Sequence, residues 1–176
     1  MNPDLNKVKM VISDVDGVWT DGSIYKGNDG IELKRFSVND GAGVAILRSA
    51  ELKLALISGR YSEATAERAK ELKIDDLYNG TLNKIPPYEE LKSKYNLQDN
   101  EIAYIGDDII DIPVMDLVGV PIATDNASKE CKSAAVYITQ KSGGYGAFRE
   151  AVEWILLKQN RLESVLLKLR EEVKDL

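Results

Sequence analysis

Two clusters of aspartates in the sequence have the residue types and the spacing to do chemistry. The first lies in DVDGVWTD (14–21) and the second in GDDIID (106–111). Asp14 and Asp16 stand two residues apart at an extended chain end, so their side chains point the same way, and Gly17 allows a sharp turn after them. Converging carboxylates repel one another unless a cation lies between them, and an all-oxygen ligand set suits Mg²⁺. One cluster alone could be a charged strand end or a helix N-cap, but the pair predicts a magnesium site.

Ser58 and Lys84 could supply what phosphoryl transfer needs besides a metal and a nucleophile. The transferred group must be held in line with the attacking oxygen, and its charge must be neutralised. Ser58, which precedes Gly59, can donate hydroxyl and backbone hydrogen bonds to a phosphate. Lys84 can neutralise the phosphate and keep Asp14 ionised, although a lysine considered alone would be a solvated surface residue. Together with the aspartates, these residues favour a phosphoryl-transfer enzyme.

The composition excludes several other kinds of catalyst. The 176 residues contain no histidine, which removes histidine phosphatases, Ser-His-Asp and Cys-His catalysis and nearly all catalytic zinc sites. The single cysteine, Cys131, has no arginine soon after it to cradle a phosphate, so we expect a half-buried structural residue. One cysteine cannot form an internal disulfide, which fits a reducing compartment, and we expect a cytoplasmic protein. The net charge of -6 disfavours nonspecific attraction to nucleic acid or to an anionic membrane.

The chain alternates between apolar runs and helical stretches. Near-continuous apolar runs predict strands that are buried on both faces of a parallel sheet, at 8–13, 54–58, 102–106 and 120–124. Helical patterns follow them at 41–51, 62–72, 84–95 and 109–118. This alternation predicts one α/β domain over 1–176, with a doubly wound, mostly parallel sheet. Ligands bind at the carboxyl ends of the strands in such folds, where the candidate residues fall.

Two segments depart from the alternation. Residues 23–37 carry two β-type runs around GNDG, which predicts a hairpin, and an isolated hairpin needs something to pair with. Residues 147–174 contain neither glycine nor proline and predict one long helix. A heptad seam runs along it through Phe148, Val152, Ile155, Gln159, Leu162, Leu166, Leu169, Val173 and Leu176. The seam could pack on the chain's own sheet, but so long a helix would overhang the domain, so we favour an intersubunit contact.

The four elements, in this order, resemble the signature motifs of the haloacid dehalogenase superfamily. They are the DxD strand end at 14–16, Ser58, Lys84 and the GDDxxD at 106–111. The resemblance implies that Asp14 is phosphorylated as the nucleophile and that Asp16 is the general acid and base, with Ser58 and Lys84 completing the catalytic set. It also implies that Mg²⁺ is bound by Asp14, Asp107 and the backbone carbonyl of Asp16. Asp108 and Asp111 would support the metal site.

A narrower resemblance covers almost the whole chain. DVDGVWTDG, the hairpin, VNDGAG, ISGRYS, LYNGTLNK, AYIGDDIIDIPVM and KSGGYGAFRE are similar to the 3-deoxy-D-manno-octulosonate (KDO) 8-phosphate phosphatases of that superfamily. This similarity implies a phosphorylated sugar acid as substrate and lipopolysaccharide precursor synthesis as the pathway. The implied substrate contacts are Asp16, Ser37, Val38, Asn39, Asp40, Gly41, Ala45, Arg60, Arg68 and Lys84. Asn39 and Tyr145 depart from the family pattern near the pocket, whereas Arg60 favours the eight-carbon acid.

The short spacing of the motifs leaves no room for a cap domain, so the site needs shielding from elsewhere. The resemblance implies a homotetramer in which hairpins form a central barrel and neighbouring chains complete each site. Three alternatives remain open: a phosphatase for a nine-carbon (KDN or sialic acid) 9-phosphate, a phosphomutase, and a non-catalytic oligomerisation module. Paired turnover of the two sugar esters discriminates the first. A mutase usually needs a cap, and a non-catalytic module usually lacks a signature carboxylate.

Overall fold

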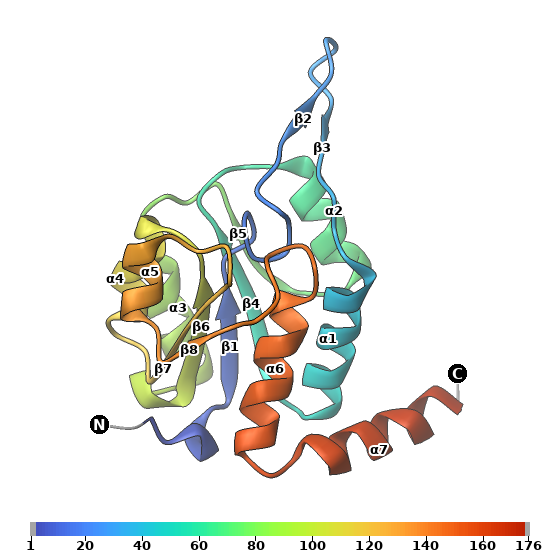
Figure 1. Cartoon of the computed structure of the whole chain (residues 1–176), viewed down its shortest axis with the longest axis vertical. Coiled ribbons are helices and arrows are strands. Elements are labelled where there is room, and N and C mark those ends of the chain that lie inside the picture. The colour runs from blue at the N-terminus through green and yellow to red at the C-terminus, as the bar shows by residue number, and fades with distance from the viewer. Residues whose placement is uncertain (1–2, 175–176) are drawn as a thin grey trace.

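The computed structural model describes residues 3–174, and its centre is a six-stranded parallel sheet (Figure 1). The order across the sheet is β5-β4-β1-β6-β7-β8, and every pairing in it is parallel. The strands are β1 (Met10–Ser13), β4 (Lys53–Ser58), β5 (Asp76–Asn79), β6 (Ile102–Gly106), β7 (Val120–Ala123) and β8 (Tyr137–Ile138). The chain builds outward from β1 on one side and then crosses to β6 on the other, which confirms the doubly wound fold. The crevice beyond the carboxyl ends of β1 and β6 is therefore where a ligand is expected.

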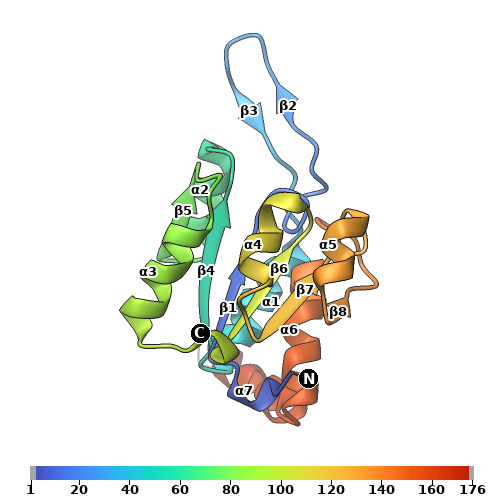
Figure 2. The same cartoon turned by 90° about the vertical axis from the view of Figure 1, so that its left-hand side faces the viewer.

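Helices cover both faces of the sheet, and each face has its own apolar core. Alternate residues of β1 point to opposite faces, so Val11 joins one core while Met10 and Ile12 join the other. The first face carries α1 (Val38–Ser49), α2 (Glu63–Glu71), α6 (Ala147–Lys158) and α7 (Leu162–Lys174). The second face, toward the viewer in Figure 2, carries α3 (Ile85–Tyr95), α4 (Ile112–Met115) and α5 (Lys129–Ala134). No cap domain is inserted into the part of the chain that the structure describes.

Element boundaries differ from the predicted ranges where capping or proline intervenes. Helix α1 begins at Val38 rather than at residue 41 because the Ser37 hydroxyl accepts a hydrogen bond from the Asn39 amide and caps the helix. The helix predicted over 109–118 is a 3₁₀ turn (Ile109–Asp111) followed by the short α4. Proline in the first turn of α4 has no amide to donate, so it fits the start of a new helix and not the interior of a long one.

The predicted hairpin is present and projects from the body of the molecule (Figure 1). Strands β2 (Tyr25–Lys26) and β3 (Glu32–Leu33) pair antiparallel, and the Gly27 amide donates to the Ile31 carbonyl across the turn, at 2.9 Å. Its apolar side chains are left in solvent: Ile24 is 44% exposed and Leu33 63%. The hairpin thus presents apolar surface that its own chain does not cover.

The prediction of a single long C-terminal helix is wrong, because α6 and α7 are separate helices that meet at a bend (Figure 1). Asn160 adopts a left-handed conformation (φ 55°), which ends α6 and which asparagine tolerates better than most residues. The buried Gln159 side chain donates to the carbonyl of Leu5, and Arg161 donates to that of Ala50, so polar contacts fix the bend.

The expectation of an intersubunit seam is also wrong for α6. Phe148, Val152 and Ile155 are fully buried in the core of their own domain, and Val165 on α7 is 5% exposed. Leu162, Leu166 and Leu169 pack on the edge of that core, whereas Val173 is exposed. Leu176 lies outside the described residues. Because the bend turns α7 back toward α1, most of the seam serves intramolecular packing.

The burial of Cys131 and the character of the helices complete the description of the fold. Cys131 is fully buried rather than half-buried, on the core face that α3, α4 and α5 cover. Within residues 3–174, none of the helices has the length and apolar character that crossing a membrane would require.

Candidate active site

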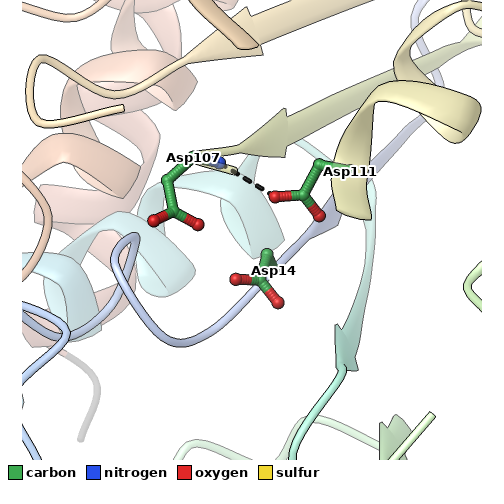
Figure 3. A group of neighbouring side chains, drawn as sticks. All are labelled: Asp14, Asp107 and Asp111. Atoms are coloured by element: carbon green, nitrogen blue, oxygen red, sulfur yellow. Dashed lines mark hydrogen bonds between the residues drawn. The ribbon is translucent and has the colours of Figure 1, made fainter. Parts of the chain in front are cut away.

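Three carboxylates converge beyond the carboxyl ends of β1 and β6 (Figure 3). Asp14 follows β1, whereas Asp107 and Asp111 follow β6, and one oxygen from each lies within 4.8 Å of the others. Lys84, at the start of α3, completes the cluster: its Nζ lies 2.5 Å from Asp14 Oδ1 and 2.6 Å from Asp111 Oδ1. The Lys84 side chain is fully buried, so it is an interior ion-pair partner and not a solvated lysine. The structure therefore brings together one residue of the first motif, Asp14, with Lys84 and two aspartates of the last motif.

Asp111 holds this cluster in place through both of its oxygens. Oδ1 accepts hydrogen bonds from Lys84 and from the Tyr104 hydroxyl, at 2.6 Å each. Oδ2 accepts from the backbone amides of Asp107 and Asp108, at 2.9 and 3.2 Å. A carboxylate with four donors around it has little capacity left for a metal ion. Asp111 thus orients its neighbours, which leaves Asp14 and Asp107 as the carboxylates that can bind a ligand.

The electrostatics of the cluster favour a bound cation. Burial raises the pKa of Asp14, and repulsion from Asp111 raises it further, while Lys84 acts in the opposite direction. Burial likewise raises the pKa of Asp107, with added repulsion from Asp14 and Asp111. Burial lowers the pKa of Lys84, but Asp14 and Asp111 outweigh it and raise that pKa above its ordinary value. One ammonium group among three carboxylates leaves excess negative charge, and the hard oxygen donors fit Mg²⁺.

The loop after β1 brings the backbone close to this cluster. Gly17 has a φ of 90°, and a Cβ at this position would lie 2.0 Å from Asp107 Oδ2. Only glycine fits, both for its backbone conformation and for the space that the carboxylate occupies. The Gly17 carbonyl accepts a hydrogen bond from the Asn126 side chain at 2.9 Å, which ties the loop to the segment after β7. The glycine thus allows Asp14 and Asp107 to lie close together.

Asp16 follows Asp14 by two residues, and Ser58 is the last residue of β4, the strand that pairs with β1. Asp16 is partly exposed, and its carboxylate contacts the Lys34 ammonium group at 2.7 Å. The buried Ser58 hydroxyl donates to the Arg60 carbonyl at 2.8 Å. The Ser58 carbonyl accepts from the amides of Gly80 and Thr81, which fixes the end of β4.

An open cavity of about 210 Å³ gives access to this cluster. Charged residues and apolar residues both line it. The lining residues are Asp14, Asp16, Ile24, Gly59, Arg60, Leu82, Asp107, Asp108 and Ile110. Arg60 reaches the cavity while its guanidinium binds the Glu32 carboxylate with two hydrogen bonds, as a planar fork does. A cavity of about 160 Å³ between the carboxyl end of α1 and the amino end of β4 contains none of the catalytic candidates.

The remaining predicted substrate contacts form a second group, which does not line the 210 Å³ cavity at the carboxylate cluster. Asp40 is fully buried and accepts hydrogen bonds from the amides of Gly146 and Arg149, so it binds the start of α6. Arg68 donates to the Ser37 carbonyl at 3.4 Å. The other members of the group are Val38 and Asn39, which are exposed, and Gly41 and Ala45, which are partly buried. Within one chain, the expected substrate contacts are therefore divided between two places.

Two charged residues at the base of the hairpin contact candidate site residues, although no sequence motif marks them. Lys34 contacts Asp16, and Glu32 contacts Arg60, so both place a charge beside a candidate site residue. Neither lies in a motif: Glu32 belongs to the two-residue strand β3, and Lys34 follows it directly. The only local signal is that the hairpin follows directly after the DxD loop.

Comparisons with known proteins agree with this geometry. A family model described as haloacid dehalogenase-like hydrolase matches residues 48–147. The chain is 44% identical over 156 residues to the KDO 8-phosphate phosphatase of Yersinia pestis, covering 89% of this chain and 83% of that protein. It is 40% identical over the same length to the enzyme of that name from Escherichia coli K12, with the same coverage.

Solved structures agree as well. A crystal structure of the Yersinia pestis phosphatase superposes with a TM-score of 0.88 at 43% identity and covers 90% of this chain and 86% of that one. The Moraxella catarrhalis phosphatase, solved with magnesium, phosphate and KDO, superposes with a TM-score of 0.89 at 36% identity and covers 93% of this chain and 94% of that one. Both the sequence matches and the shared fold extend over most of the molecule. The chain belongs to the haloacid dehalogenase-like hydrolases.

Proposed function

We propose that the chain is a Mg²⁺-dependent phosphomonoester hydrolase that converts KDO 8-phosphate to KDO and phosphate. The observation that carries the proposal is the buried Asp14, which Lys84 holds at 2.5 Å and which also lines an open cavity. A carboxylate fixed in this way can attack a phosphorus atom, and the adjacent ammonium group offsets the negative charge of both. The named relatives act on this sugar ester, which supports the choice of substrate.

The reaction proceeds in two displacements at phosphorus. In the first, an Asp14 oxygen bonds to phosphorus while the bond from phosphorus to the sugar oxygen breaks, and Asp16 donates a proton to that oxygen. In the second, water bonds to phosphorus, its proton passes to Asp16, and the Asp14–phosphorus bond breaks. Ser58 and Lys84 hold the phosphoryl group in line for both steps. Each displacement returns the carboxylates to the form that the next one needs.

The metal site uses groups that are already close together. Asp14 and Asp107 would hold Mg²⁺ through their side chains, and Asp16 through its backbone carbonyl. When bound, the ion supplies charge neutralisation at the phosphoryl oxygens. Asp111 keeps Lys84 and the Asp107–Asp108 backbone in position, which is a supporting role.

Recognition of the sugar acid would involve both groups of residues. Arg60 lines the cavity, and its guanidinium would recognise the carboxylate of the sugar acid by exchanging Glu32 for it at the planar fork. Residues 37–41, Ala45 and Arg68 would complete recognition in a homotetramer, in which neighbouring chains contribute to each site. The hairpin, with its exposed apolar side chains, would form the central contact of that assembly. Cytoplasmic location and a role in lipopolysaccharide precursor synthesis follow from the proposed substrate.

Phosphate release from KDO 8-phosphate and from KDN 9-phosphate, each with Mg²⁺ and with EDTA, tests the proposal. We expect Mg²⁺-dependent turnover that favours the eight-carbon ester and falls by about 1000-fold or more in Asp14→Asn. Asp116→Asn, at an exposed aspartate on the second face, is the control and should keep wild-type activity. Preference for the nine-carbon ester would contradict the proposed substrate but not the proposed mechanism. Turnover that survives EDTA would contradict the proposed dependence on Mg²⁺.

A further inference from the structure

Lys34 occupies an unusual position for a lysine at the end of a surface hairpin. It follows β3 directly, yet its side chain is fully buried. Its Nζ donates one hydrogen bond to Asp16 Oδ2 at 2.8 Å and a second to the Thr65 hydroxyl at 3.2 Å, and it lies 2.7 Å from Asp16 Oδ1 as an ion pair. A buried ammonium group is tolerated only where acceptors surround it, and here a carboxylate and a hydroxyl supply them. The hairpin base is therefore anchored inside the protein at Asp16.

The Lys34 ammonium group is the main constraint on the Asp16 carboxylate within the described residues. The other side-chain donor near it is the Thr20 hydroxyl, 3.5 Å from Oδ1, at the limit of a hydrogen bond. The Thr20 hydroxyl in turn accepts from the amides of Gly17 and Gly22, so it shapes the loop more than it holds the carboxylate. Lys34 reaches both oxygens, and Thr65 on α2 fixes the Lys34 ammonium group. The orientation of Asp16 thus depends on a residue from the hairpin.

We propose that Lys34 is a positioning residue that acts through Asp16. It holds the carboxyl group where it can give a proton to the leaving oxygen and later accept one from water. Lys34 itself forms hydrogen bonds and transfers no proton. This inference rests on the proposed function, in which Asp16 is the general acid. It links the hairpin to the chemical step through a defined contact, apart from any part the hairpin has in assembly.

The dependence of kcat/KM on the leaving group distinguishes a positioning role of Lys34 from a merely structural one. An alkoxide or phenolate leaves a phosphorus atom poorly without a proton, whereas p-nitrophenolate leaves readily without one. The ratio kcat/KM covers the steps up to phosphorylation of Asp14, so it isolates protonation of the leaving group from the later attack by water. Misplacing Asp16 should therefore lower kcat/KM for KDO 8-phosphate and phenyl phosphate and change it little for p-nitrophenyl phosphate.

The experiment measures kcat/KM for these three esters in Lys34→Met, Lys34→Arg, Thr65→Val and Asp16→Asn. We expect Lys34→Met to lose about 10- to 100-fold on the two esters with poor leaving groups, in the same pattern as Asp16→Asn but to a smaller extent. Lys34→Arg should recover part of the loss, and Thr65→Val should show a weaker form of it because Asp16 keeps its partner. Lys129→Met, an exposed lysine on α5, is the matched control.

Three outcomes would overturn the inference. An equal loss on all three esters would indicate a structural role, and a loss confined to the sugar ester would indicate a substrate contact. Unchanged rates in a folded Lys34→Met would show that Asp16 needs no such support. If Lys34→Met does not fold, Thr65→Val and Lys34→Arg test the inference by the same comparison of kcat/KM among the three esters. Failure of the proposed function is distinguishable, because the wild-type enzyme would then not hydrolyse KDO 8-phosphate.

Discussion

Asp111 illustrates how a residue can matter to catalysis while its side chain is fully enclosed. Its oxygens accept from Lys84, Tyr104 and two backbone amides, so one carboxylate fixes a cation, a strand end and the loop that carries Asp107. Removing its charge would leave the Lys84 ammonium group with one carboxylate partner where it now has two. It would also place an amide group among donors, where it cannot accept at every position.

We predict that Asp111→Asn weakens Mg²⁺ binding by about 10- to 100-fold, the usual cost of losing a group that orients a metal ligand. The measurement is the Mg²⁺ concentration for half-maximal phosphate release, with direct titration by calorimetry. Asp116→Asn serves again as the control. An unchanged Mg²⁺ requirement would show that Asp111 does not organise the metal site.

At this scale the sequence predicts the site well where motifs carry it and fails where they do not. Asp14, Lys84 and two of the three aspartates after β6, Asp107 and Asp111, meet as expected because parallel strands end at one edge of the sheet. The contacts of Lys34 and Glu32 could not be predicted, since they depend on how the hairpin folds back over the site. The contacts of the buried Asp40 carboxylate with the start of α6 could not be predicted either, because they join segments far apart in the sequence.

At the scale of elements, local sequence decides how helices end. The C-terminal region reads as one helix because it lacks glycine and proline, and the heptad pattern continues through the bend. Yet Gln159, Asn160 and Arg161 are polar, and they end α6 by binding carbonyl groups of other segments and by the left-handed turn. Strands β5 and β8, with four and two residues, and the short α5 were also missed, because elements of this length give no measurable periodicity.

We predict that Asn160→Ala lowers the free energy of unfolding by about 1 kcal/mol, because alanine adopts the left-handed conformation at a higher cost. Asn160→Gly should be neutral or slightly stabilising. Urea unfolding checks both, with Lys158→Ala on the exposed side of α6 as the control. Equal stability of the alanine variant would show that the bend is set by tertiary contacts alone.

The base of the hairpin is a second element-scale feature, and its charge pair responds to pH. The Arg60 guanidinium lowers the pKa of Glu32 from an ordinary 4.5 to about 2, mainly through its hydrogen bonds. A depressed acid pKa means that the contact stabilises the fold above about pH 4.5 and is lost as the pH falls toward 2. The hairpin should therefore remain docked at neutral pH and loosen only in strong acid.

NMR titration of the Glu32 carboxyl carbon should find a midpoint near 2, which rises toward 4.5 in Arg60→Ala. Arg48→Ala, which removes an exposed arginine that donates to the Leu72 carbonyl, should leave the midpoint in place. A Glu32 midpoint that is already near 4.5 in the wild type would contradict the docking contact.

At the scale of the whole molecule, the hairpin is the feature whose apolar side chains the chain itself leaves exposed. Two strands alone are marginally stable in water, and Ile31 and Leu33 are 56% and 63% exposed. Apolar side chains of this size on a projecting hairpin favour burial against other copies. The proposed tetramer would bury them and would also bring the second group of substrate contacts to a neighbouring cavity.

We predict that the wild type sediments as a tetramer and that Ile31→Glu combined with Leu33→Glu dissociates it, because carboxylates cannot be buried in that contact. Leu157→Glu, at a 59% exposed leucine on α6, should leave the assembly intact. A wild type that sediments as a monomer at working concentration would contradict the assembly. Dissociation without loss of turnover would show that each chain completes its own site.

The position of Lys34 and Glu32 at the hairpin base limits how this protein could be shortened. Deleting residues 23–37 to obtain a minimal core would remove the partners of Asp16 and Arg60 along with the projecting loop. A graft that replaces only the tip, residues 26–31, would keep both side chains where they are. Such a graft would separate the contacts of the hairpin base with Asp16 and Arg60 from the apolar tip, so insertions and deletions should be tolerated at the tip and not at the base.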